Sequence, residues 1–319
     1  MRLDLRDLQL FVALARHEHF TRAAEECGIS QPALSQRIAN LEAALGTPLV
    51  RRGARFGGFT EEGRLLLGWA RRILAESDAM LAELTSSRGD VSGHVTMGVI
   101  PTALAFSARV AATVRADHPR LVPVVRSASA REIAAGLATG AFDIGISYTE
   151  ADGASDAESH GLAAPRPLYR ESYVLLAPNG LVEAGKRRLS WAEAATLPLA
   201  LLTPDMKNRQ IIDQAFRHAG VSPRPVFETN SISTLHAFLA EAGVATIAPA
   251  NAARSAPLPG TDAMPETVIL DLVEPDLRRV VAALVPDDRF EPPGVTAVLQ
   301  GAAKVAAEMS AVGRRRPKR

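Results

Sequence analysis

The first third of the chain places apolar residues at the three- and four-residue spacing of amphipathic helices. This spacing over residues 3–15 predicts a first helix. A short second helix is expected over residues 22–27, capped by Thr21. A third helix should begin after Ser30, whose side chain can cap it, and end at Gly46, a residue suited to a left-handed helix stop. Three short helices in series therefore open the chain.

A longer helical pattern without proline runs from residue 60 to about residue 87. Its apolar positions alternate in steps of three and four, and further leucines repeat at every seventh position. An apolar stripe on one long helix needs a partner, so the pattern favours a seam between the helices of two chains. Packing on the helix's own chain is the alternative. The residues expected in the seam are Leu66, Leu67, Ile73, Leu74, Met80, Leu81 and Leu84.

After about residue 90 the pattern changes, and short β-type runs alternate with helical stretches. The β-type runs cover residues 95–100, 122–127, 142–147, 173–177, 199–202, 226–228, 244–248, 268–272 and 280–285. The helical stretches cover residues 102–117, 130–139, 207–219, 231–242 and 294–309. This alternation predicts an α/β fold with mostly parallel strands.

The net charge of the chain limits how it could bind nucleic acid. The 36 Lys and Arg residues oppose 35 Asp and Glu residues, which leaves a net charge of +1. Five of the positive charges lie within residues 314–319, and removing these five leaves −4 for the rest of the chain. Because the body of the chain is mildly acidic, any nucleic-acid binding must come from a local patch. The basic tail itself is expected to be a solvated end.

The composition also excludes several classes of protein. The single cysteine, Cys27, rules out a disulfide framework and a cysteine-cluster metal site. No apolar run reaches the ~18–20 residues of a membrane helix, and acidic residues occupy the N-terminal stretch where a signal peptide would be apolar. The sequence therefore predicts a cytoplasmic protein without a membrane partner.

Residues 5–45 fit a helix-turn-helix, in which the last helix lies in the major groove of DNA. A three-helix core without DNA contact would show the same periodicity. The residues on the exposed face of the last helix distinguish the two possibilities. That face carries Gln, Ser and Arg, which can bond to base edges or phosphates, and the arginines of residues 51–55 would add phosphate contacts. The residues expected at the DNA are Thr21, Arg22, Ser30, Gln31, Pro32, Ser35, Gln36, Arg37, Arg51, Arg52 and Arg55.

These same residues carry a family resemblance over about the first 65 positions. The motifs are Phe20-Thr-Arg-Ala-Ala-Glu, Ile29-Ser-Gln-Pro-Ala-Leu-Ser, Leu41-Glu, Leu45-Gly, Pro48-Leu with Arg52, and Phe59-Thr-Glu with Gly63. They resemble the N-terminal signature of LysR-type transcriptional regulators. The resemblance implies a winged helix-turn-helix, a dimerising linker helix and a two-subdomain effector domain like a periplasmic binding protein. It also implies a homodimer or homotetramer on promoter DNA, whose effector changes DNA bending and contact with RNA polymerase.

Three positions depart from the family pattern. Two glycines at 57 and 58 replace β-favouring residues, so the strands of the wing are expected to be short or mobile. Val50 stands where the family tends to have Phe. Cys27 stands where Leu is typical, and without a partner cysteine it is interpreted as a small buried apolar residue rather than a redox sensor.

The resemblance also divides the chain. Residues 1–60 are expected to form the DNA-binding domain and residues 61–89 the linker helix. The first effector subdomain is expected over 90–165 and 267–312, the second over 166–266, and the basic tail over 313–319.

Hydroxyl side chains follow three of the expected strands, at Thr102, Ser129 and Thr203. Ligands of parallel α/β domains bind at such strand-to-helix junctions, although each residue could simply cap its helix. The resemblance implies ligand contacts at Thr102 and Ser129. Further candidates are Arg209, Asn230 and Thr246, of which Arg209 could also lie on a solvated helix face.

Residues 197–232 look similar to the branch that contains the cyanate-responsive regulator, which favours a small anion or carboxylate as effector. No cofactor is expected. Seven histidines are scattered without metal-ligand spacing, and no Gly-x-Ser-x-Gly turn occurs, so the sequence does not predict an enzyme. A bare solute-binding protein would share the α/β part but would lack the first 90 residues.

Overall fold

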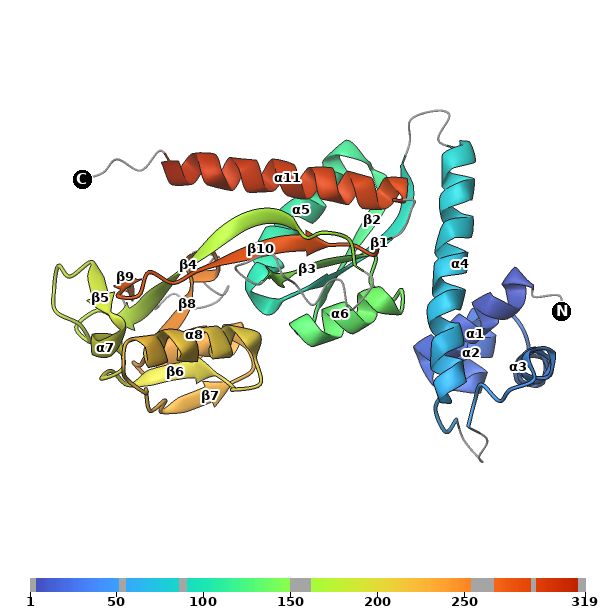
Figure 1. Cartoon of the computed structure of the whole chain (residues 1–319), viewed down its shortest axis with the longest axis horizontal. Coiled ribbons are helices and arrows are strands. Elements are labelled where there is room, and N and C mark those ends of the chain that lie inside the picture. The colour runs from blue at the N-terminus through green and yellow to red at the C-terminus, as the bar shows by residue number, and fades with distance from the viewer. Residues whose placement is uncertain are drawn as a thin grey trace.

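The computed structural model of the chain describes residues 4–51, 56–85, 91–149, 162–253, 267–287 and 291–314. Arg52, Arg55, the tail beyond residue 314 and the side chain of Leu84 therefore lie outside the described residues. A helical N-terminal domain, the long helix α4 (Glu61–Thr85) and an α/β body follow one another along the molecule (Figure 1). No helix among the described residues is long and apolar enough to span a membrane.

The N-terminal domain consists of α1 (Leu5–His17), α2 (Phe20–Glu26) and α3 (Gln31–Leu45). Ser30 caps α3 as expected, accepting a hydrogen bond from the amide of Ala33, and Gly46 ends the helix in the left-handed region at φ 70°. The expected cap of the second helix is wrong: His19 holds the N-cap position and Thr21 already lies inside α2. Apolar residues at helical spacing, among them Phe11, Leu34 and Ile38, form the core of this domain.

Residues 52–55 in the middle of the wing after α3 lie outside the described residues. Its described part contains one antiparallel bridge, between Val50 and Phe59, flanked by a hydrogen bond from Arg51 N to Gly58 O. Phe56 and Phe59 pack edge to face, and both lie against the core of the helices. Gly63 is required where α4 begins, because a Cβ there would come within 2.0 Å of the carbonyl oxygen of Leu49.

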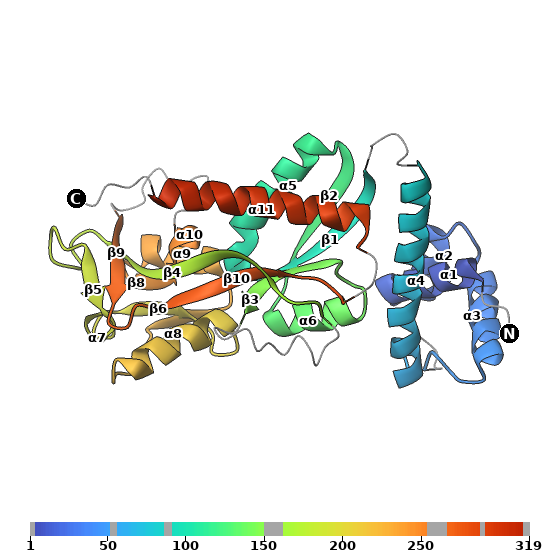
Figure 2. The same ribbon diagram turned by 45° about the horizontal axis from the view of Figure 1, so that its top comes forward.

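The first effector subdomain is built on β1 (Ser92–Val99), which pairs in parallel with β2 (Arg120–Ser127) and β3 (Ile144–Thr149). The connections are the short turn η2 (Pro101–Ala103), α5 (Leu104–Asp117) and α6 (Ala130–Ala138). After the second subdomain the chain returns through β10 (Arg278–Leu284) and ends in α11 (Pro293–Arg314), which packs against α5 and β1 (Figure 2).

The second effector subdomain has its own core around Trp191, Phe216 and Ile247. Its elements are β4 (Arg166–Pro178), β5 (Arg188–Ser190), α7 (Trp191–Ala194), β6 (Leu199–Leu202), α8 (Lys207–His218), β7 (Phe227–Thr229), α9 (Ile232–Glu241), β8 (Ala245–Pro249), α10 (Ala250–Ala253) and β9 (Thr267–Val273). Of these, β5, α7 and α10 are not in the sequence prediction, and each is only three or four residues long.

Two strands, β4 and β10, join the subdomains. Along the sheet the order is β2-β1-β3-β10-β4-β8-β6-β7, so β10 and β4 lie in the middle. Every antiparallel pair between the described strands involves one of these two, and the other pairs are parallel. The expectation of mostly parallel strands therefore holds away from the crossover. Contrary to expectation, β9 pairs with β4 and β5 of the second subdomain, so the chain returns to the first only at β10.

Candidate DNA-binding surface and effector site

The exposed face of α3 carries a row of polar side chains. Gln31 donates a hydrogen bond to Ser35 Oγ at 2.9 Å, and Gln36 donates to Asn40 Oδ1 at 2.9 Å. Both pairs lie along the helix surface and have no buried partner, so the amides can exchange these bonds for base edges. Asn40 extends this row by one turn beyond the expected residues.

Arg37 differs from its neighbours because it is anchored to another helix. Its guanidinium forms an ion pair of 2.8 Å with Asp7 of α1 and lies 4.0 Å from Asp4. The pair holds α3 against α1 and leaves Arg37 about half exposed, which suits a phosphate contact better than base reading. Thr21 and Arg22 are exposed at the start of α2, as is Pro32 at the start of α3.

A buried glutamate fixes the wing to α3. The carboxylate of Glu42 accepts hydrogen bonds from the amides of Leu49 at 2.8 Å and Val50 at 3.0 Å. Arg51, the next residue, is exposed on the wing. Sequence reasoning missed the role of Glu42, although the residue stands in the motif Leu41-Glu, because a helical glutamate followed by a turn is normally solvated.

Cys27 is half-buried against the core of the helices, in agreement with its interpretation as a small apolar residue. Burial raises the pKa of its thiol. A raised pKa keeps the group protonated and slow to react with oxidants.

The linker helix divides its apolar residues between two surroundings. Leu66 and Leu67 pack against the core of the N-terminal domain, so the expected alternative of packing on the same chain holds for them. Leu65, Trp69, Ile73 and Met80 are exposed to 66%, 52%, 39% and 53%. The exposed stripe therefore begins at Leu65, one residue before the expected seam. It also includes Trp69, which the three- and four-residue spacing did not predict.

A buried polar cluster lies where the two effector subdomains join. It contains all three tyrosines of the chain, Tyr148 on β3 and Tyr169 and Tyr173 on β4. Tyr148 OH donates to Glu171 Oε2 at 2.9 Å, and Tyr169 OH lies 3.4 Å from Glu171 Oε1. Glu171 is 1% exposed, and its partners in the described structure are neutral hydroxyls. We call these residues, together with Thr102 and Asn208, the junction cluster.

The junction cluster connects the two subdomains directly. Thr102 of the first subdomain shares a 2.9 Å hydrogen bond with Tyr148 OH. Asn208, in the first turn of α8, donates to the hydroxyls of both Tyr148 and Tyr173 at 3.2 Å. Of these bonds, the one between Asn208 and Tyr148 crosses from one subdomain to the other, so movement of the subdomains must break or exchange it.

The cluster also perturbs the acidity of its members. Burial raises the pKa of Glu171 to about 7, and the hydrogen bonds from Tyr148 and Tyr169 offset only part of this effect. Burial likewise raises the pKa of each of the three tyrosines. The concentration of every tyrosine within 26 positions of sequence was the signal that could have revealed this cluster.

Two of the six expected effector residues, Thr102 and Thr203, have hydroxyls that no helix cap uses. Thr102 belongs to the junction cluster, as described above. The hydroxyl of Thr203 is buried without a hydrogen-bond partner among the described residues. It does not cap α8, whose N-cap is Met206, so the hydroxyl remains available to a ligand.

The other expected effector residues are used by the fold itself. Ser129 forms a capping box with Glu132 at the start of α6, which occupies both its amide and its hydroxyl. Thr246 was wrongly expected at the ligand, because it is fully buried and its hydroxyl donates to the carbonyl of Ala200. Asn230 is exposed just before α9.

Arg209 is buried rather than on a solvated helix face. Its guanidinium forms ion pairs with Asp213 at 2.8 Å and Glu228 at 2.6 Å, and it donates to the carbonyl of Leu202. These partners hold α8 against β6 and β7. They also leave the guanidinium neutralised, so it offers no spare charge to an anion.

Two known family descriptions match this chain, one in its N-terminal part and one in its α/β part. The description "Bacterial regulatory helix-turn-helix protein, lysR family" matches residues 5–64, and "LysR substrate binding domain" matches residues 88–307. Together these matches cover the N-terminal helices, the wing and both effector subdomains.

Individual relatives agree with the family matches. A Mycobacterium avium protein described as "Probable hydrogen peroxide-inducible genes activator" is 36% identical over 61% of each chain. The DNA-binding transcriptional dual regulator OxyR of Escherichia coli K12 is 30% identical over 88% of each chain. Among solved structures, a full-length OxyR variant of Pseudomonas aeruginosa superposes with a TM-score of 0.74, covering 96% of this chain and 98% of that one at 20% identity.

Proposed function

This chain belongs to the LysR family of transcriptional regulators, and we propose that a small molecule at the junction of its effector subdomains changes how paired DNA-binding domains sit on a promoter. The family consists of DNA-binding regulators with an effector domain, not of enzymes. The observation that carries the proposal is the junction cluster, in which Asn208 and Tyr148 link the two subdomains. The hydroxyl of Thr203, shortly before α8, has no partner among the described residues and is the group proposed to meet the ligand.

Base reading is assigned to Gln31, Ser35 and Gln36 of α3, which present exchangeable polar groups on an exposed face. Phosphate contacts are assigned to the residues flanking this face. These are Thr21, Arg22, Ser30, Pro32, Arg37, Arg51, Arg52 and Arg55. A ligand-driven shift of the paired readers would then bend the DNA and alter contact with RNA polymerase, in the cytoplasm.

Two copies would join through the exposed stripe of α4, and two such dimers through the effector domains. The two ends of the sheet support the second contact. Val122 is exposed on the edge strand β2, and Val226 and Phe227 are exposed at the opposite edge strand β7. A two-fold axis would bring the β2 edge of each copy to the β7 edge of the other, so both apolar edges would be covered at once.

The junction cluster changes the expected chemistry of the effector. The sequence predicts a small anion or carboxylate, but the cluster contains the carboxyl of Glu171, and the nearby Arg209 is already paired with two acids. A buried carboxyl without a cation disfavours a second negative charge. A neutral ligand that donates and accepts hydrogen bonds fits these residues better, and the similarity to the cyanate-responsive branch stays a prediction.

The peroxide response named for several relatives is not extended to this chain. Direct sensing of peroxide by a thiol needs a reactive cysteine. The chain has one cysteine, Cys27, which lies at the end of α2 in the DNA-binding domain and not in the effector domain. Burial raises the pKa of its thiol. An effector domain without cysteine supports reversible ligand binding instead.

Footprinting of the full-length protein on the DNA upstream of its own gene tests the proposal. At roughly physiological salt with excess competitor DNA, non-specific binding is weak, so a protected two-fold site identifies specific reading. Gln36→Ala should weaken binding to that site more than to random DNA, and Arg52→Ala should weaken both and reduce the salt dependence. Equal losses of Gln36→Ala on both DNAs would contradict base reading, and no protected site at micromolar protein would contradict the function proposed for α3.

A further inference from the structure

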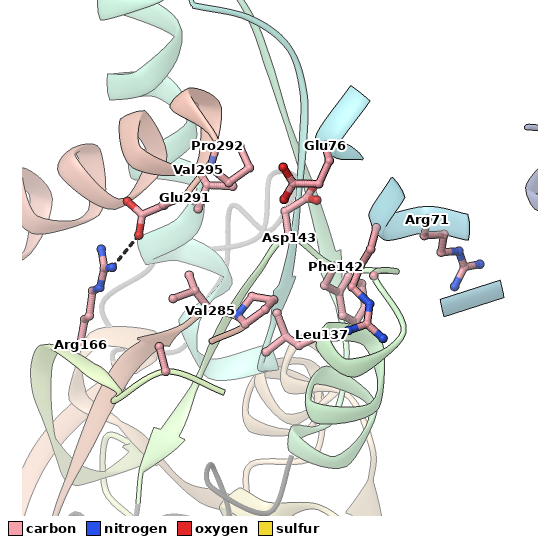
Figure 3. Close-up of a pocket in the computed structure, with 14 residues that line it drawn as sticks. Arg71, Glu76, Leu137, Phe142, Asp143, Arg166, Val285, Glu291, Pro292 and Val295 are labelled. Atoms are coloured by element: carbon pink, nitrogen blue, oxygen red, sulfur yellow. Dashed lines mark hydrogen bonds and ion pairs between the residues drawn. The ribbon is translucent and has the colours of Figure 1, made fainter. Parts of the chain in front are cut away.

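A cavity of about 120 Å³ lies between α4 and the first effector subdomain, away from the junction cluster (Figure 3). Arg71, Arg72 and Glu76 of α4 form one wall, and segments next to α6, β3 and the start of α11 form the other. A protein cavity on the order of 150 Å³ holds one benzene-sized molecule. The space therefore suits one small organic ligand.

The helix and the subdomain touch directly beside this cavity. A Cβ at Gly68 of α4 would lie 3.7 Å from the Cα of Thr139, and a Cβ at Gly140 would lie 3.0 Å from the Cβ of Arg71. The first is an ordinary van der Waals contact, whereas the second is tight, so Gly140, at φ 64°, is the residue that allows the close approach of α4 to the turn after α6. A ligand in the cavity would touch both the helix that carries the DNA-binding domain and the effector domain.

One polar group of the cavity wall is a buried donor without an acceptor. The Nε of Arg72 is buried and has no hydrogen-bond partner in the described structure. Its guanidinium lies over the ring of Trp69, 4.3 Å from the centroid, a contact that orients the group without using its N–H donors. Because a buried donor is costly when unpaired, an acceptor supplied by a ligand would be favoured here.

The acidic groups of the cavity have capacity left for a cation. Asp143 accepts one hydrogen bond, from the amide of Thr96 to Oδ2. Glu76 is exposed and has no ion pair or hydrogen bond within the described ranges. Figure 3 draws the carboxyl groups of Glu76 and Asp143 at the same end of the cavity. Arg71, in contrast, points away from the other lining residues in that view.

The remaining charges are already balanced, and the rest of the wall is apolar. Arg166 pairs with Glu291 at 2.5 Å, and Glu291 also accepts a hydrogen bond from Thr296. The apolar lining residues are Leu137, Phe142, Val285, Pro292 and Val295. The groups of the wall that remain open are therefore one donor, Arg72 Nε, and two carboxyl groups, those of Glu76 and Asp143, next to an apolar surface.

We propose that this cavity binds a small zwitterion with a short aliphatic body. The ligand's ammonium group faces Glu76 and Asp143, its carboxylate accepts from Arg72, and its aliphatic part packs on Phe142 and its apolar neighbours. This second site is separate from the junction cluster. Its occupation changes DNA binding to the extent that the ligand prefers one orientation of α4 over another.

The test uses three compounds that share one carbon skeleton. Isothermal titration of the full-length protein compares L-valine with isovalerate, which lacks the ammonium group, and isobutylamine, which lacks the carboxylate. Each deleted ionic contact should weaken binding at least about tenfold. L-valine that binds no more tightly than either fragment, or that does not bind at millimolar concentration, overturns the proposal.

Variants locate the bound compound. Glu76→Gln should weaken L-valine and isobutylamine by about tenfold and spare isovalerate, and Arg72→Gln should weaken L-valine and isovalerate and spare isobutylamine. Glu62→Gln, on the exposed first turn of the same helix, is the matched control. Binding that survives Glu76→Gln but is lost in Thr203→Val would place the compound at the subdomain junction and contradict this site. No DNA is present, so the outcome is independent of the footprint.

Discussion

Glu42 and Glu171 are both buried, one in the DNA-binding domain and one in the effector domain, and their partners differ in kind. Glu42 accepts two hydrogen bonds from main-chain amides of the wing. Glu171 is held by the hydroxyls of Tyr148 and Tyr169, which stand on different strands. Amides fixed by the fold give the first carboxylate one arrangement, whereas hydroxyls can rotate and exchange partners around the second.

The difference matches what each region has to do. The wing must keep its position on α3 so that the DNA-binding surface stays constant. The subdomain junction must allow at least two arrangements, because a ligand can shift only an equilibrium that exists. Substitutions that remove one kind of partner at a time test whether the two carboxyl groups differ in this way.

The largest effect is expected for Glu42→Ala. Two buried amides, of Leu49 and Val50, would lose their acceptor, at about 1–3 kcal/mol each. The wing should detach and specific DNA binding should be lost, as measured by urea unfolding and fluorescence anisotropy with labelled DNA. Glu25→Ala, at an exposed position of α2, is the control. A variant that keeps wild-type stability and DNA affinity would show that the wing does not depend on this carboxylate.

Glu171→Gln should change the pH dependence of stability. The folded state holds a proton with a pKa of about 7, whereas the unfolded carboxyl releases it near its ordinary value of 4.5. Stability contributed by this proton is complete below pH 4.5 and is lost as the pH rises towards 7, by about 3 kcal/mol in total.

Unfolding midpoints at several pH values check this prediction. The glutamine variant should lose most of the slope between pH 4.5 and 7 and be more stable than the wild type at pH 8. Arg279 lies opposite Glu171 in the pairing of β4 with β10 but bonds to Gln214, so it does not supply a counter-charge that would reverse the sign. Asp205→Asn, at an exposed site, should leave the slope unchanged.

Tyr148→Phe should loosen the junction at a cost of about 1–2 kcal/mol, because Thr102, Asn208 and Glu171 each lose a partner. Hydrogen exchange of β3 and of the start of α8 should become faster. Tyr169→Phe is the matched control, since that hydroxyl contacts Glu171 on its own strand and does not bridge the subdomains. Equal effects of the two substitutions would remove the bridging role assigned to Tyr148.

The smallest change in stability is expected for Thr203→Val, within about 0.5 kcal/mol, because its hydroxyl has no partner in the described structure. Response to the effector of the junction should nevertheless be lost. Thr246→Val should have the opposite combination of effects. It removes the hydrogen bond to the carbonyl of Ala200 and should lower stability by about 1 kcal/mol, while the effector response is kept. An effector response retained by Thr203→Val in reporter assays would exclude this hydroxyl from the site.

Much of the fold could be predicted from local signals. Ser30 and Gly46 mark the ends of α3 because capping and left-handed stops depend on a few neighbouring residues. The order of strands and helices follows from periodicity in the same way. The position of β9 could not be predicted, since pairing with β4 and β5 depends on contacts between distant segments.

The candidate sites show the same division. The exposed row on α3 follows from helical spacing and agrees with the structure. Thr246 was expected at a ligand from the sequence, and Ser129 from its position after a strand and from the family resemblance, but their hydroxyls are used by Ala200 and Glu132. Whether a hydroxyl is free or occupied depends on tertiary packing, which no local pattern contains.

The gathering of all three tyrosines in the junction cluster has an optical consequence. A phenol absorbs at longer ultraviolet wavelengths once it loses its proton, and burial raises the pKa of Tyr148, Tyr169 and Tyr173 alike. In an alkaline titration, the folded protein should therefore show no tyrosinate absorbance until the subdomains separate. Tyrosinate absorbance at alkaline pH therefore reports the opening of the subdomain junction in the native chain, without an attached dye.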